Sequence, residues 1–151
     1  MSIQIMLTLM RGGQSLKTVA VPMTHGDSTK SNILVYADDL ISAGIEFGST
    51  YYGEPTLCLF VAALVGGVVK QTVSFWCRPY KDGAYYSFRT NGIAAWCYRV
   101  GDSNPTTNSS FVSSGNNADP SLAVIHIMPD TTMSETPDSF ICTAVYLTTK
   151  S

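Results

Sequence analysis

Charge is what this sequence has least of. Only 13% of its 151 residues are charged, about half of the usual share in soluble domains. Nine basic residues against eleven acidic ones give a formal net charge of −2, which lacks the basic footprint of a nucleic-acid-binding domain. Charged side chains also keep a surface solvated and monomeric. Their scarcity therefore argues against nucleic acid as a partner and favours a surface that another subunit covers.

Long hydrophobic runs are missing as well. The longest covers residues 57–69 and is broken by a Gly-Gly pair, which is short of the ~18 residues that a membrane helix needs. The sequence therefore predicts no membrane insertion. The first 13 residues alternate in polarity and lack the basic-then-apolar pattern of a signal peptide. We expect synthesis in the cytoplasm, which leaves open a later place in a virion or an extracellular assembly.

Known catalytic motifs are absent from the sequence: it has no G-x-S-x-G, phosphate-binding glycine loop or H-E-x-x-H. His25 lies in a polar loop near Asp27, and His126 alternates with apolar residues as a strand histidine does. Asp38 and Asp39 are adjacent, so in an extended chain they point to opposite sides and make a poor acid–base pair. We expect a protein that is not an enzyme and has no catalytic residue. A hydrolase or transferase with an unrecognised Cys/His site is the third alternative for function.

The four cysteines also lack a metal-binding pattern. They are separated by 19, 20 and 45 residues, whereas zinc sites use close pairs such as C-x₂-C. We therefore expect no metal and no cofactor. The strand register derived below separates Cys77 from Cys97 beyond the ~7 Å limit for a disulfide, so the cysteines are predicted to be buried thiols.

Short alternating segments between turn residues make up most of the chain. They predict one all-β domain over residues 1–151, an antiparallel β-sandwich or jelly roll. A long polar loop is expected at residues 101–120, and a helical turn or irregular crossing at residues 37–43. The strands predicted outside the central segment cover residues 3–9, 14–21, 33–36, 44–52, 121–128 and 139–149.

The most informative segment is residues 56–99. Gly-Gly at 66–67, Asp-Gly at 82–83 and Asn-Gly at 91–92 separate four strand-like runs. Such dipeptides between apolar runs are the strongest local hairpin signal, so the segment predicts a four-strand meander. Pro79 has no N–H to donate and selects among the possible registers. The expected cross-strand pairs at the turns are Leu64 with Val69, Tyr80 with Ala84, and Arg89 with Ile93.

These registers predict two different faces of the meander. One is small, branched and sulfur-bearing, and is expected to face the core through residues such as Cys58, Phe60, Phe75 and Cys77. The other is aromatic and is expected to face outward, although an aromatic interior is the alternative. It is the predicted binding surface, and it comprises Trp76, Arg78, Tyr80, Tyr86, Phe88, Trp96 and Tyr98.

Two functions of different class fit an outward aromatic face. Trp, Tyr and Arg are enriched in binding hot spots, and an exposed aromatic patch needs a partner to cover it. The first function is a structural subunit that associates with itself or with other subunits, as in a virion, a phage tail or decoration, or a surface appendage. The alternative is a carbohydrate-binding module or adhesin, in which Trp76 or Trp96 stacks on a sugar ring of a glycan.

Overall fold

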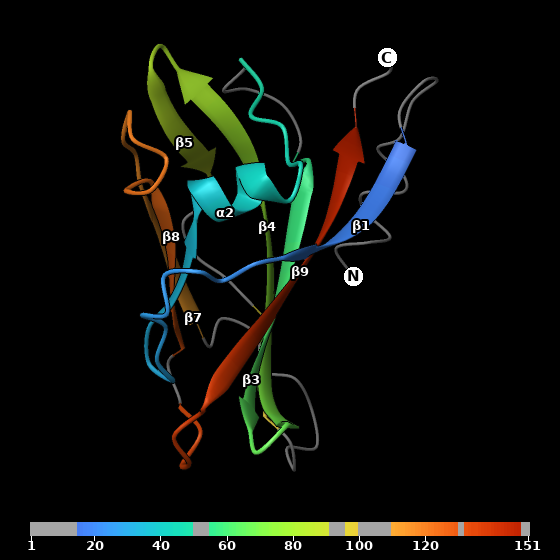
Figure 1. The fold of residues 1–151 in the computed structure, drawn as a ribbon, viewed down its shortest axis with the longest axis vertical. Coiled ribbons are helices and arrows are strands. Elements are labelled where there is room, and N and C mark those ends of the chain that lie inside the picture. Colours follow the sequence, from blue (N-terminus) through green and yellow to red (C-terminus); the bar gives the residue numbers. More distant parts are fainter. Residues whose placement is uncertain (1–14, 50–54, 91–95, 100–109, 130–131, 149–151) are drawn as a thin grey trace.

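The computed structural model describes residues 15–49, 55–90, 96–99, 110–129 and 132–148. Within these ranges the chain forms two antiparallel sheets that pack against each other (Figure 1). The sandwich predicted from the sequence is confirmed. The described part of the chain contains one helix, α2 (Ala37–Ser42), at the position of the predicted helical turn.

The larger sheet has the strand order β1-β9-β3-β4-β5, and β6 also pairs with β4. Because β3, β4 and β5 follow one another and β9 returns from the end of the chain to lie beside β3, four of its strands form a Greek key. The strands of this sheet are β1 (Ser15–Val21), β3 (Leu57–Val65), β4 (Val68–Asp82), β5 (Tyr85–Arg89), β6 (Trp96–Arg99) and β9 (Ser139–Thr148).

The smaller sheet has the order β2-β8-β7 and consists of β2 (Ile33–Tyr36), β8 (Val124–Pro129) and β7 (Ser110–Gly115). Strand β7 replaces part of the polar loop predicted at residues 101–120, in which Phe111 and Val112 were the expected anchor. Its serines and glycine resemble a loop in sequence, but Val112 is buried in the core and the strand pairs with β8 along its length. A single buried valine is too weak a signal to mark a strand from sequence.

The hydrophobic core lies between the two sheets. Val35, Ile125 and Ile127 of the smaller sheet pack in one cluster with Leu59 and Phe75 of the larger sheet. The side chains on β2, β8 and β4 alternate with more exposed ones, as a strand with one buried face requires. On β3 the alternation is lost, because Leu57, Cys58 and Leu59 are all buried.

Strands β3 and β4 form the first predicted hairpin, and Leu64 does pair with Val69. Gly66 and Gly67 make its two-residue turn with positive φ at both positions, as a type I′ turn needs. However, a bulge between Ala63 and Leu64 shifts the register of the remaining pairs by one residue. Since a one-residue slip exchanges the two faces of a strand, Cys58 and Phe60 do not face the core as predicted.

Strands β4 and β5 close around Gly83 and Ala84, so Asp82 pairs with Tyr85 rather than Tyr80 with Ala84. Pro79 still occupies a position that needs no donor toward β5, because it belongs to the fourth pair from the turn, which is not hydrogen-bonded in a two-residue hairpin. Its carbonyl instead accepts from Gly48 N at 3.3 Å on the opposite edge. Pro79 does exclude registers that need its missing N–H, but more than one loop satisfies that requirement.

The fourth strand differs from the predicted meander. Strand β6 pairs with the first half of β4, and β5 pairs with the second half. The two strands therefore follow one another along the same partner and do not form a hairpin with each other. The predicted partner of Arg89, Ile93, lies outside the described residues, as does the Asn-Gly turn.

The remaining predicted strands compare well with the structure. Strands near residues 14–21, 33–36, 121–128 and 139–149 are confirmed as β1, β2, β8 and β9. In the described part of the predicted strand at residues 44–52, only an isolated parallel bridge between Gly48 and Tyr80 is formed. The strand predicted at residues 3–9 lies outside the described residues.

Replacing Phe75 by alanine should test the position of the core. Phe75 is among the largest fully buried side chains, and Phe→Ala in a core costs about 3–5 kcal/mol. We expect that loss in the free energy of unfolding measured with urea. Leu122→Ala is the control, because Leu122 is 59% exposed and surface changes usually stay within about 0.5 kcal/mol. Equal effects of the two changes would contradict this core.

Candidate functional site

The outer face of the larger sheet, which points away from the smaller sheet, carries a second hydrophobic cluster. Cys58 on β3 lies opposite both Trp76 on β4 and Val145 on β9, and Leu16 on β1 lies opposite Leu147 on β9. The outer cluster therefore crosses four neighbouring strands. Its members are Leu16, Cys58, Phe60, Trp76, Val145 and Leu147.

Burial differs between the centre and the rim of the outer cluster. Cys58 and Val145 are 0% and 4% exposed, whereas the other four side chains are only partly buried around them. Farther along the same face of β9, Ile141 is 54% exposed. Antiparallel sheets usually have one face on the core and one in water. The outer face of this sheet instead carries an apolar cluster beside polar residues such as Thr72, Ser74 and Thr143.

Four of the predicted binding residues lie on or beside this outer face. Trp76, Arg78 and Tyr80 alternate along β4 on the side opposite to the buried Phe75 and Cys77. Tyr98 on β6 pairs with Thr72 and is 38% exposed. The backbone of Trp96 pairs with that of Ser74 in the same ladder.

Tyr86 and Phe88 were also predicted on this face, but the structure does not place them there. They pair with Lys81 and Pro79, which puts them on the core side of the sheet. Phe88 is only 4% exposed, and its ring meets that of Phe47 edge-on with centroids 5.4 Å apart. The turn at Gly83 and Ala84 is the cause, because it shifts β5 by an odd number of residues relative to the predicted register.

The four cysteines are buried thiols in the structure, as predicted. Cys97 pairs with Val73, four residues from Cys77 along β4, so the two lie far apart. Burial is the main cause that raises the pKa of the Cys77 and Cys142 thiols, the latter to about 12. A thiol with such a pKa is a poor nucleophile near neutral pH.

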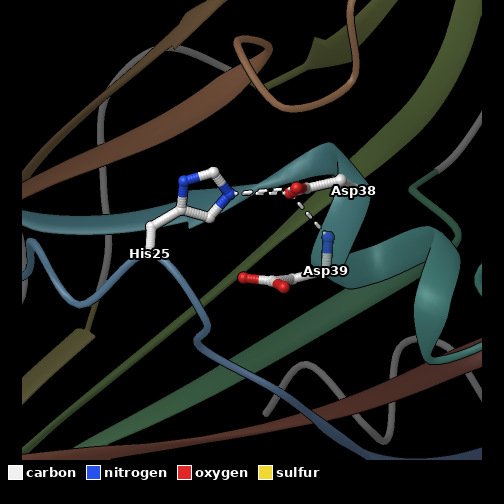
Figure 2. A group of neighbouring side chains, drawn as sticks. All are labelled: His25, Asp38 and Asp39. Carbon is white, nitrogen blue, oxygen red and sulfur yellow. Dashed lines mark hydrogen bonds and ion pairs between the residues drawn. The ribbon is translucent and has the colours of Figure 1, made fainter.

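A second group of side chains gathers where the chain enters and leaves β2. The loop before β2 carries His25, and α2 directly after β2 carries Asp38 and Asp39. The imidazole Nε2 of His25 lies 2.9 Å and 3.1 Å from the two carboxylate oxygens of Asp38 (Figure 2). The His25 ring also stacks on Tyr36, with ring centroids 3.6 Å apart. Both contacts fix the orientation of the imidazole.

Asp39 is held more firmly still. It is 5% exposed, and its carboxylate accepts hydrogen bonds from the backbone N–H and the hydroxyl of Thr24, at 3.0 Å and 2.6 Å. Nearby, the Tyr36 hydroxyl donates to Asp27. That hydrogen bond, with burial and the charges of Asp27 and Asp38, raises the pKa of Tyr36 to about 12.

His25, Asp27, Tyr36 and Asp39 border a cavity of about 410 Å³, whereas Asp38 is not among its lining residues. Its wall is apolar at Leu34 and Phe140 and acidic at Asp27, Asp39 and Asp138, and His25 also lines it. The cavity lies between the loop before β2, α2 and the beginning of β9. No lysine or arginine is among the residues that line it in the described part of the chain.

Sequence reasoning missed this group because it treated residues 38 and 39 as extended chain. At the first turn of α2 both carboxylates instead come within 4.8 Å of each other and of a ring nitrogen of His25. The loop histidine was expected near Asp27 but pairs with Asp38. The predicted helical turn, combined with His25, was the one signal that could have indicated the group.

Comparisons with protein-family models, with curated proteins and with solved structures find no match to this chain. Among the described residues, no helix is long and apolar enough to cross a membrane.

Thiol labelling should distinguish buried thiols from disulfides. We expect no rapid reaction of the folded protein with a soluble aromatic disulfide reagent near neutral pH, because the cysteines are buried and burial disfavours the thiolate. Four thiols should react once guanidinium unfolds the chain without reductant. Two or fewer reactive thiols in the unfolded protein would show that a disulfide exists.

Proposed function

We propose that this protein is a non-enzymatic structural subunit of a larger assembly and that the outer face of its larger sheet is the interface. The observation that carries the proposal is the apolar character of this second sheet face. Cys58 and Val145 are already buried within the chain, and the partly buried side chains around them, Trp76 and Phe60 among them, offer apolar surface to a partner. Aromatic residues are enriched in the cores of protein interfaces.

Composition supports the same proposal. The chain has few charged residues with which to keep such a face solvated. Ile141 and Tyr98 are exposed on the same face, where Thr143 and Ser74 separate them from the outer cluster. Exposed apolar side chains rimmed by polar ones are typical of protein–protein contact sites. Other copies of the chain or different structural subunits, such as those of a virion, phage particle or surface appendage, are the proposed partners.

The surroundings of Trp76 favour assembly over glycan binding. An aromatic platform for a sugar ring needs an open ring face, but Trp76 packs against Cys58 and its apolar neighbours. The described cavity, in turn, is lined by carboxylates and lies away from Trp76. A carbohydrate-binding module or adhesin is therefore the second choice.

The chemistry of the nucleophilic side chains favours a protein without catalysis. The raised pKa of Cys77 and Cys142 keeps both thiols protonated. His126 lies on β8 and pairs with Leu34 of β2 and Ser113 of β7. A structural role in the sheet accounts for a histidine at this position. The Cys/His hydrolase or transferase is accordingly the third choice.

Oligomeric state in solution tests the proposed interface. We expect size-exclusion chromatography with light scattering to find a stable oligomer of the wild-type chain. The double substitution Leu16→Ser and Leu147→Ser should weaken association at least 10-fold, because it places hydroxyls on two directly opposed rim positions. Leu122→Ser, which changes an exposed leucine outside the outer cluster, should leave the oligomer intact.

Folding of each variant is followed by near-ultraviolet circular dichroism, so that loss of the oligomer is separated from loss of the fold. A folded wild-type chain that stays monomeric and is retained on a glycan array would support the adhesin instead. Dissociation by Leu122→Ser to the same extent as by the double substitution would contradict this location of the interface.

A further inference from the structure

The group formed by His25, Asp38 and Asp39 combines two kinds of metal ligand. One imidazole nitrogen and two carboxylates lie within 4.8 Å of one another (Figure 2). Imidazole binds zinc and its first-row neighbours, whereas carboxylate is accepted by nearly all divalent cations. The nitrogen makes this group chemically different from the acidic clusters that are common on protein surfaces.

The ligands are also prearranged by contacts outside the group. Thr24 holds the buried Asp39 carboxylate through two hydrogen bonds, and Tyr36 holds the plane of the His25 ring by stacking. Outer contacts of this type orient the ligands of metal sites and raise their affinity.

The cavity beside the group provides the electrostatic reason for a cation. Asp27 and Asp138 line it together with Asp39, and no lysine or arginine is among its described lining residues. A concave surface of one sign concentrates ions of the opposite sign. The same cavity gives solvent access to the group, which an entering ion requires.

We propose that His25, Asp38 and Asp39 bind a divalent first-row transition-metal ion at the mouth of this cavity. The 2.9 Å between Nε2 of His25 and the Asp38 oxygen is a hydrogen-bond distance, whereas tetrahedral zinc with bonds of about 2.1 Å holds its ligand atoms about 3.4 Å apart, so the two groups separate by about 0.5 Å to admit the ion. The ion takes the place of the proton between these two atoms. That proton goes to solvent or to Nδ1, so that Nε2 offers its lone pair. Positions facing the cavity stay available to water.

This site is independent of the proposed interface. It lies on the loop before β2 and on α2, and none of its three residues belongs to the outer cluster. Its occupation would join two segments on either side of β2. A failure of the metal site would therefore leave the proposed assembly untouched, and the reverse holds as well.

Calorimetric titration of the metal-free, full-length protein with zinc chloride tests the site. We expect one equivalent to bind, and magnesium chloride to bind at least 10-fold more weakly, because magnesium retains water and disfavours nitrogen ligands. Asp38→Asn and His25→Ala should each lower the zinc affinity by at least 10-fold. Thr24→Val keeps the backbone donor to Asp39 but removes the hydroxyl, and should lower the affinity 10–100-fold, the range for outer contacts.

The controls use the same residue types away from the three ligands. His126→Ala removes the other histidine, and Asp138→Asn removes a cavity carboxylate outside the group. Both should keep the zinc affinity within about 3-fold of the wild type, a change of about 0.65 kcal/mol at 25 °C. Each variant is checked for its fold by circular dichroism.

Several results would overturn the proposal. No zinc binding by the folded wild type would do so, as would unchanged affinity in both Asp38→Asn and His25→Ala. Equal losses in Asp138→Asn and Asp38→Asn would show that the cavity attracts cations only by its general charge. If His25→Ala fails to fold, Asp38→Asn and Thr24→Val still decide the matter.

Discussion

The structure depends on the hydrogen bonding of one long strand, β4, which has partners along both of its edges. Along a strand, successive N–H and C=O pairs point to opposite edges, and successive side chains point to opposite faces. Strand β3 and Gly48 use one edge, while β5 and β6 share the other. Each pairing thereby assigns its partner's side chains to the core or to the outer face. The core at Phe75 and the outer cluster at Trp76 both follow from this one strand.

The bulge between Ala63 and Leu64 determines what kind of surface the outer face is. Without it, Cys58 and Phe60 would face the core, and Leu57 and Leu59 would lie outside. With it, a sulfur and an aromatic ring join Trp76 and Val145 on the outside. The polar group at His25 lies on a different part of the molecule, where the loop before β2 and α2 border the cavity. The molecule therefore has an apolar cluster on its outer face and, separately, a polar recess.

The sequence was sufficient where local chemistry decides the structure. Alternation predicted the sandwich and most strands, the Gly-Gly turn predicted the pair of Leu64 and Val69, and spacing predicted buried thiols. The sequence was insufficient where a contact between distant segments determines the strand register. The bulge after Ala63 and the choice between two loops near Gly83 each shift a register by an odd number, which exchanged the predicted faces of β3 and β5. Of the predicted surface, Trp76, Arg78, Tyr80 and Tyr98 remain, whereas Phe88 belongs to the core. The group of His25, Asp38 and Asp39 was not predicted, because its side chains come together only through the helical turn of α2.

The pairing of β1 with β9 has a consequence for how the molecule is made. Ser15 and Thr148 are hydrogen-bonded although 133 residues separate them, and β9 lies between β1 and β3 in the sheet. Until residue 148 has been synthesised, β1 and β3 both lack the neighbour that joins them. Folding that relies on such distant contacts is slow, and unpaired strand edges invite aggregation meanwhile. While the chain is being synthesised, the apolar strands β1 and β3 are therefore present for a time without β9, the strand that lies between them in the sheet.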